Sequence, residues 1–197
     1  MIDLNGYEDV KPATSGKFNR LPPGGYVCQI INAHITNSKA GRPMLVLFID
    51  IVNGELAGYF RALTDSAKKF RPNTLWDNSG IFRQLIFDSS GKTSPFFKGL
   101  LTCIQLSNPS FKFNPHQFDE SLLRGCFVGF VFAEEEYQKR DGSIGVRTVT
   151  KFPLSTVDLN NNNFTVPELK KLSATPKTEP DSFFQNASPV PDDDVPF

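Results

Sequence analysis

Basic and aromatic side chains are interspersed along the stretch from Arg61 to Lys98. The stretch holds seven lysines and arginines against three aspartates, a net charge of +4, and Phe60, Phe70, Trp76 and Phe82 lie within or beside it. Proteins that hold single-stranded DNA without sequence preference combine cations along a groove with aromatic faces on which bases stack. This composition therefore predicts a stacking groove for a single strand.

Further candidates lie on predicted strands and turns outside this stretch. Phe48 is on the less aliphatic face of a strand, Arg147 and Lys151 share one face of another, and a hairpin turn carries Lys139 and Arg140. The full DNA-binding set we predict is Arg42, Phe48, Tyr59, Phe60, Arg61, Lys68, Lys69, Arg71, Trp76, Lys139, Arg140, Arg147 and Lys151.

The alternative for each aromatic candidate is burial, because phenylalanine is usually a core residue. A core position for Phe48, Tyr59 and Phe60 is as compatible with the sequence as a stacking role, and Trp76 suits a packed lid. We assign a second group mainly to the core: Phe97, Phe127, Phe130, Phe132 and Phe152.

Acidic residues concentrate at the C-terminal end. Residues 173–197 hold one lysine against five acidic residues, a net charge of −4, which leaves +4 on residues 1–172 of a chain with no net charge. This segment is rich in Ser, Thr, Pro, Asn and Asp and buries too little apolar surface to offset its ordering entropy, so we expect disorder. An acidic tail also competes with DNA for a basic groove, most strongly at low salt.

The last residues have types suited to docking onto another protein. They are Asp192, Asp193, Asp194, Val195, Pro196 and Phe197. A terminal ring and carboxylate fit an apolar pocket beside a cation, the aspartates steer towards a basic rim, and proline limits the conformations that must be ordered. The alternative is an ordinary acidic tail that confers solubility.

Five strands and one helix account for most of the remaining chain. We predict strands over Tyr26–Thr36, Met44–Val52, Leu56–Leu63, Arg124–Tyr137 and Ile144–Phe152. Alternating aliphatic residues, with turn residues between the runs, support them. Ser94-Pro95 is typical of a helix start, and Phe97, Leu100, Leu101 and Ile104 then repeat at helical spacing. Helical patterning is weak over 65–70 and 81–87, and a last short helix is expected over 166–172.

This order of elements predicts a mainly β fold. Three strands, a helical insertion and two strands match an OB-like five-stranded antiparallel barrel with a helix between strands three and four; other small barrels and a split sheet remain alternatives. We divide the chain into a flexible N-terminal arm (1–20), an OB-like DNA-binding domain (21–172) and a disordered tail with an acidic docking tip (173–197).

Two resemblances add to this interpretation. The last six residues resemble the C-terminal tip of bacterial single-stranded-DNA-binding proteins, acidic residues followed by Ile-Pro-Phe, with Val195 in place of isoleucine. That resemblance implies docking of replication, recombination and repair proteins.

The body, about two thirds of the chain, is similar to a family of bacteriophage single-stranded-DNA-binding proteins. The residues that carry it are 21–26, 41–51, 96–98, 107–109, Gly125 and 134–137. It implies an OB-like barrel that protects single-stranded DNA during phage DNA replication and recombination.

The residues do not suggest an enzyme. His34 and His116 are far apart and lack metal-type spacing, and we find neither a phosphate-binding glycine loop nor a nucleophile motif. We therefore expect no cofactor, no metal and no catalytic residue, although carboxylates of a nuclease could converge in space.

The three cysteines, Cys28, Cys103 and Cys126, are odd in number and widely spaced. This suits a reducing cytoplasm, which for a phage protein is that of the host.

No signal peptide and no membrane-spanning segment are expected. The expected partners are single-stranded DNA and, through the tip, replication or recombination proteins; the sequence is also compatible with a homo-oligomer. The alternative function is a phage interaction or recombination-mediator protein that captures host replication factors through its tail without binding DNA.

Overall fold

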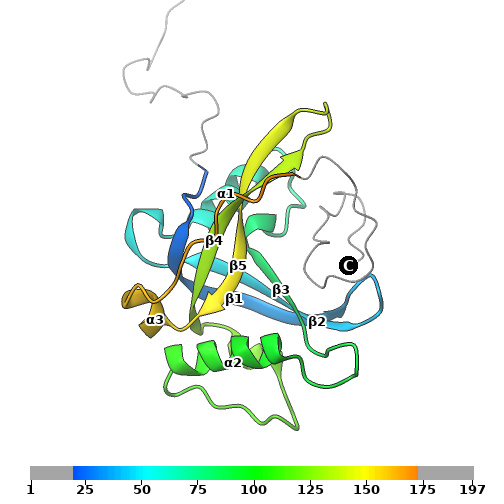
Figure 1. Cartoon of the computed structure of the whole chain (residues 1–197), viewed down its shortest axis with the longest axis vertical. Coiled ribbons are helices and arrows are strands. Elements are labelled where there is room, and N and C mark those ends of the chain that lie inside the picture. Colours follow the sequence, from blue (N-terminus) through cyan, green and yellow to red (C-terminus); the bar gives the residue numbers. More distant parts are fainter. Residues whose placement is uncertain (1–19, 173–197) are drawn as a thin grey trace, which may run out of the picture.

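The fold is built on a five-stranded antiparallel sheet, as expected for a mainly β protein. The computed structural model describes residues 20–172. Neighbouring strands follow the order β3-β2-β1-β4-β5. Their bounds are β1 (Gly24–Asn37), β2 (Pro43–Ile51), β3 (Ile81–Leu85), β4 (Phe127–Gln138) and β5 (Ile144–Leu154). Figure 1 shows that the sheet is strongly curved, with the β1–β2 hairpin crossing the β4–β5 hairpin at a steep angle.

Helices cover the two ends of this sheet. They are α1 (Tyr59–Lys68), α2 (Pro95–Ser107) and α3 (Thr156–Asn160), with short 3₁₀ helices η2 (Gly54–Leu56), η3 (Asn78–Gly80) and η4 (Glu120–Leu123). The helix predicted from Ser94-Pro95 is α2, and its predicted apolar stripe, including Leu100 and Ile104, is buried. In Figure 1, α2 lies at one end of the molecule and α1 lies towards the other.

The prediction of a third strand over Leu56–Leu63 was wrong, because this segment forms η2 and the first half of α1. The Asp50 carboxylate accepts a hydrogen bond from the backbone N–H of Phe60 at 3.0 Å and so occupies a donor in the first turn of α1. Phe60 and Thr64 then face inward at a spacing of four residues, the period of a helix. This tertiary contact, together with inward burial, selects helix for an apolar run that also fits a strand.

The true third strand, β3, lies in a stretch where helical patterning was expected. Its pairing with β2 explains the difference, since Phe82 lies opposite Leu47 and faces the core while Arg83 lies opposite Val46 on the outer face. The alternation of inward and outward side chains has a period of two, which is that of a strand.

The segment after β5 covers part of the outer face of the sheet. Phe164 and Leu159 pack so closely on Gly25 that an added Cβ would lie 2.5 Å from the Phe164 ring. Lys170 then pairs with β4, as its N–H donates to the Glu134 carbonyl at 3.1 Å. The helix expected over 166–172 was therefore wrong. Beyond Phe132, β4 is no longer paired with β1, and its backbone groups on that side need other hydrogen-bond partners. The extended segment around Lys170 supplies them at Glu135.

The hydrophobic core lies between the inner face of the sheet and α1 and α2. Phe97, Phe130 and Phe132 are buried there as predicted, whereas Phe127 is 41% exposed and Phe152 is half-buried. The predicted N-terminal arm, except Arg20, and the predicted acidic tail lie outside the described residues. Among residues 20–172, no helix is long and apolar enough to cross a membrane.

Candidate nucleic-acid interface

The outer face of β1, β2 and β3 carries exposed or partly exposed rings together with a cation. Directly opposed residues of an antiparallel sheet lie on the same face. The pairing therefore defines three rows across these strands: Asn32–Phe48–Ile81, His34–Val46–Arg83 and Thr36–Met44–Leu85. The opposite face of β2 holds Leu45, Leu47 and Ile49, all fully buried in the core.

Two rings meet on this face. The Phe48 and His34 rings lie 5.4 Å apart between centroids, tilted by 36°. Phe48 is half-buried and His34 is exposed. The predicted outward position of Phe48 is therefore confirmed, and its role towards DNA stays a prediction. His34 is not among the DNA-binding residues predicted from the sequence, because the Phe48 ring that it meets lies on another strand.

Arg83 supplies the positive charge next to these rings. It lies in the same row as His34, and its Nη2 donates a hydrogen bond to the Asn78 side-chain oxygen at 3.2 Å. Desolvation lowers the pKa of its guanidinium, which nevertheless stays charged at neutral pH. Val46, which lies on β2 directly opposite Arg83, is only 4% exposed although it is on the outer face. Arg83 belongs to the basic stretch of the sequence, but its outward position follows from the pairing of β3 with β2.

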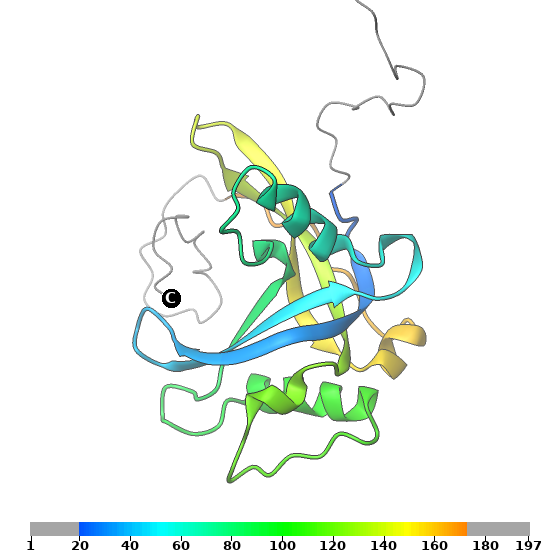
Figure 2. The same cartoon turned by 180° about the vertical axis from the view of Figure 1, so that it is seen from behind.

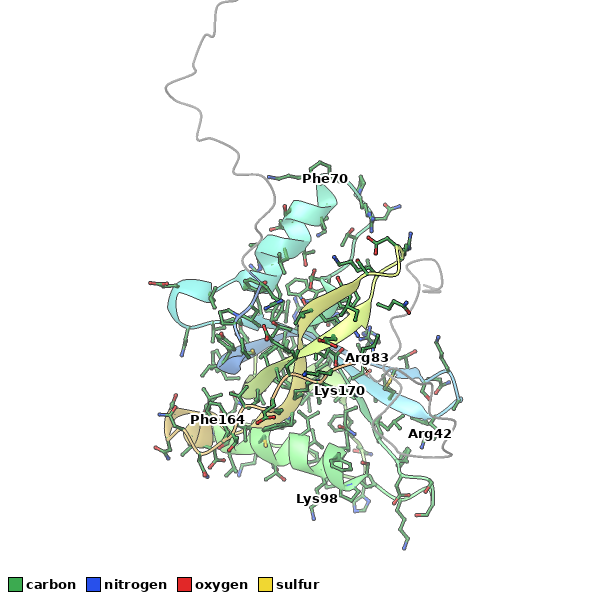
Figure 3. All side chains as sticks on the ribbon, turned by 45° about the horizontal axis from the view of Figure 1, so that its top comes forward. Arg42, Phe70, Arg83, Lys98, Phe164 and Lys170 are labelled. Carbon is green, nitrogen blue, oxygen red and sulfur yellow. The ribbon has the colours of Figure 1, made fainter. Side chains whose placement is uncertain are left out.

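Two basic turns flank the face. The β1–β2 turn carries Arg42, whose backbone N–H donates to the Ser38 hydroxyl at 3.1 Å. The β4–β5 turn carries exposed Lys139 and Arg140. Figures 1 and 2 show both turns projecting on the same side of the molecule, and Figure 3 labels Arg42 and Arg83. The two turns are thus placed to border a nucleic-acid strand that lies across this face.

Two predicted cations on β5 are held by one carboxylate. Arg147 lies 2.7 Å and Lys151 lies 3.0 Å from oxygens of Glu135, which is opposite Arg147 on β4. Burial acts to raise the pKa of Glu135, but the hydrogen bonds and charges of Lys151 and Arg147 outweigh it and hold that pKa below its ordinary value. The cluster therefore carries one net positive charge at neutral pH.

The strand that carries these cations runs close to the start of β3. Thr150 of β5 lies opposite Phe132, so it faces the core and not the side of Arg147, and its hydroxyl donates to the Ser79 carbonyl of η3 at 3.4 Å. Because η3 leads directly into β3, the curvature of the sheet brings β5 near the start of β3.

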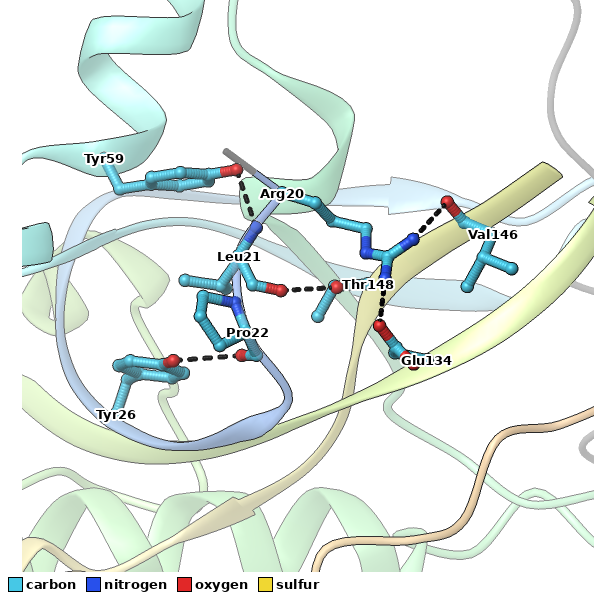
Figure 4. A network of polar contacts seen from close by, with 8 residues as sticks. All are labelled: Arg20, Leu21, Pro22, Tyr26, Tyr59, Glu134, Val146 and Thr148. Atoms are coloured by element: carbon cyan, nitrogen blue, oxygen red, sulfur yellow. Dashed lines mark hydrogen bonds and ion pairs between the residues drawn. The ribbon is translucent and has the colours of Figure 1, made fainter. Parts of the chain in front are cut away.

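Three predicted rings serve the core and its rim. Phe60 is fully buried against Phe132 and presents no face to a base. The Tyr59 hydroxyl accepts the Leu21 N–H at 3.0 Å (Figure 4), and Trp76 Nε1 donates to the Ile49 carbonyl at 3.3 Å. The stacking role predicted for Phe60 is incompatible with its burial, while Tyr59 and Trp76 are partly buried against the core.

The four predicted cations of α1 and its end lie away from the sheet face. Arg61 is exposed and reaches Asp50 with a separation of 3.7 Å, while Lys68, Lys69 and Arg71 are exposed at the C-terminal end of the helix. The structure thus separates the cations of the predicted basic stretch: Arg83 joins the rings, Lys68, Lys69 and Arg71 lie at the end of α1, and Lys92 and Lys98 lie before and on α2.

Two further groups of side chains bear on chemistry within residues 20–172: potential metal ligands and thiols. That part of the chain contains no group of three or more His, Cys, Asp or Glu side chains arranged to hold a metal ion. Desolvation raises the pKa of the thiols of Cys28, Cys103 and Cys126, which disfavours their reactive thiolate forms. The predicted docking residues, 192–197, lie outside the described part of the chain.

Comparison with known proteins adds one family. The profile of a family described as "Protein of unknown function (DUF669)" matches residues 8–82, which include β1, β2 and α1 and end at the second residue of β3. No curated protein matches the chain.

Proposed function

We propose that this protein binds single-stranded DNA, without strong sequence preference, on the outer face of β1, β2 and β3. The observation that carries the proposal is the grouping of Phe48, His34 and Arg83 on the outer face of three neighbouring strands. The rings suit stacking of unpaired bases, and Arg83 with the flanking turns suits the phosphate backbone.

The proposal includes an OB-like barrel. In support, β1 lies between β2 and β4 in the sheet, and α2 follows β3 and precedes β4. OB-folds bind oligonucleotides on the face of strands two and three, bordered by the loops between strands one and two and between strands four and five. The rings, Arg83 and the two basic turns occupy the corresponding positions.

A single strand suits this surface better than a duplex. Paired bases present only their edges in the grooves, and those grooves admit a helix or a two-stranded ribbon. A partly exposed ring on a curved sheet instead requires a base that has left its stack. Protection of single strands during phage DNA replication and recombination, with partner proteins recruited through residues 192–197, is the function we propose.

Titration with labelled oligonucleotides tests the proposal. The protein is mixed with oligo(dT), duplex DNA and RNA of equal length at two salt concentrations, and fluorescence anisotropy reports binding. We expect oligo(dT) to bind more tightly than the duplex, with weaker binding at higher salt. Phe96→Ala on α2 serves as the control for Phe48→Ala, since both remove a phenylalanine that is at least partly exposed.

The second candidate function is capture of replication proteins through the tail without DNA binding. In that case, oligo(dT) does not bind at either salt concentration, and Phe48→Ala and Phe96→Ala behave alike. Loss of the oligonucleotide in the presence of a divalent metal ion would instead indicate a nuclease.

A further inference from the structure

The end of α1 presents an exposed ring that the proposed interface does not use. Phe70 is 85% exposed, the highest fraction among the large apolar side chains of residues 20–172, and nearby Leu75 is 68% exposed. Leaving such a ring in water forgoes the stabilisation of about 1.5–3 kcal/mol that burial would provide. The ring therefore has no part in the core.

The chain that carries Phe70 is held in a defined turn. The backbone N–H groups of Phe70 and Arg71 both donate to the Ala67 carbonyl, at 3.0 and 2.8 Å, and the Thr74 N–H donates to the Arg71 carbonyl at 3.0 Å. A ring on a hydrogen-bonded turn meets a ligand with less ordering cost than one on an unstructured loop.

This turn is tied to the proposed interface. It leads into Asp77, whose N–H donates to the Thr64 hydroxyl of α1 at 2.9 Å, and then into Asn78, which accepts the hydrogen bond from Arg83. The side chain of Arg83 is thus directed from the sheet towards the segment that follows Phe70 and Leu75. Figure 3 labels Phe70 at the end of α1 and Arg83 on the sheet.

The charges around Phe70 favour an anionic ligand. Exposed Lys68 and Lys69 precede it and exposed Arg71 follows it. The β4–β5 turn, with Lys139 and Arg140, projects at the same end of the molecule as the end of α1 in both views (Figures 1 and 2). A protein-docking surface is typically depleted in lysine, whereas a ring among cations is typical of single-strand binding.

We propose that Phe70 is a second base-stacking platform and that Lys68 and Lys69 hold the phosphates beside it. A strand on the β1–β2–β3 face continues past Arg83 and Asn78 and over the end of α1. This inference rests on the proposed function and extends it, because it predicts a footprint longer than the sheet face.

A series of oligo(dT) lengths tests this platform. We compare Phe70→Ala with the unsubstituted protein on strands of about 6 and about 20 nucleotides, one near the lower end of the usual site sizes and one above them. Phe96→Ala is the matched control, an exposed phenylalanine (54%) on α2 at the other end of the molecule. We expect Phe70→Ala to weaken binding of the long strand about five-fold or more, with little change for the short strand.

A gain of signal complements this loss. In Phe70→Trp the new indole is exposed, and stacking on thymine quenches its fluorescence. We expect the long strand to quench this added fluorescence and the short strand to leave it largely unchanged. Phe96→Trp gives the corresponding control.

Three results would overturn the platform. Equal affinities of Phe70→Ala and the unsubstituted protein at both lengths would remove it while leaving the sheet interface intact. A changed oligomeric state of free Phe70→Ala, measured by light scattering, would assign Phe70 to self-association. No binding of either strand by the unsubstituted protein would overturn the proposed function as well.

Discussion

The Phe48 and His34 rings lie 5.4 Å apart on neighbouring strands, where β1 and β2 turn their outer sides away from the core. An aromatic pair at this distance is worth about 0.5–1.5 kcal/mol in a folded protein. Here the pair is open to solvent at His34 and partly open at Phe48. In the proposed interface, each ring offers a partly exposed face to an unstacked base.

Replacement of Phe48 by alanine should weaken binding of oligo(dT) by about 1–3 kcal/mol, because one stacking face is lost. Phe48→Tyr retains the ring and should bind nearly as well as the unsubstituted protein. Anisotropy titration gives the affinities, and thermal unfolding of each variant verifies the fold. Equal affinities for Phe48→Ala and Phe48→Tyr would argue against stacking.

Replacement of Arg83 by alanine should reduce the salt dependence of binding. Each phosphate neutralised on a single strand contributes about 0.7 to the slope of log affinity against log salt, so Arg83→Ala should lower the slope by about that amount. Lys98→Ala, which removes an exposed cation from α2, is the control and should leave the slope unchanged. The same small change in both variants would mean that Arg83 lies off the path of the strand.

Replacement of Glu135 by glutamine should strengthen DNA binding. The substitution removes the carboxylate that pairs with Arg147 and Lys151 and leaves both cations available to phosphates. We expect a few-fold higher affinity and a salt slope steeper by up to about 1.4. Glu55→Gln makes the same change in net charge on η2. An identical gain in both variants would show that only the total charge matters.

The same carboxylate gives a pH dependence of stability. Because the folded pKa of Glu135 lies below its ordinary value, the stability it contributes is present above that value and is lost as pH falls through the folded pKa. The difference in unfolding free energy between the unsubstituted protein and Glu135→Gln should therefore narrow at acidic pH. A constant difference from pH 7 to about pH 3 would contradict the pairing.

Replacement of Gly25 by alanine should destabilise the protein by about 1–3 kcal/mol, because the added methyl collides with the Phe164 ring. In a Phe164→Ala background the collision is absent, so the additional cost of Gly25→Ala should be much smaller. Urea unfolding of the four proteins measures this coupling. Equal costs in both backgrounds would show that residues after β5 do not cover β1.

Replacement of Asp192, Asp193 and Asp194 by asparagine should strengthen DNA binding at low salt and have little effect at high salt. We expect the acidic residues to compete with DNA for cations of the folded part, and salt to screen this competition. A salt series of titrations measures the effect. An affinity that does not change at any salt concentration would contradict it.

The sequence pattern predicted most of the strands and α2 but not the path between β2 and β3. The strands β1, β2, β4 and β5 combine aliphatic runs with turn residues, so local signals suffice. The run Leu56–Leu63 fits either a strand or a helix. The hydrogen bond from the Phe60 N–H to the Asp50 carboxylate favours the helix, and the local sequence pattern does not predict this contact. The edge of β4 that holds the segment around Lys170 likewise exists only after the sheet has formed.

The candidate interface shows the same division. The alternation along β2 predicted the outward position of Phe48 from its own strand. His34 and Arg83 join it through the register of three strands, which no local pattern determines. Phe60 and Phe70 both lie in or beside the predicted basic stretch, yet one is fully buried and the other is 85% exposed, because burial depends on how α1 packs against the sheet.

The most direct test of the central claim is an NMR titration of the isotope-labelled protein with oligo(dT). The account predicts that the largest amide shift changes lie on the three facing segments, at residues 32–36, 44–48 and 81–85. Shift changes that gather on α2, or on β4 and the segment around Phe164, with these three segments unaffected, would contradict it.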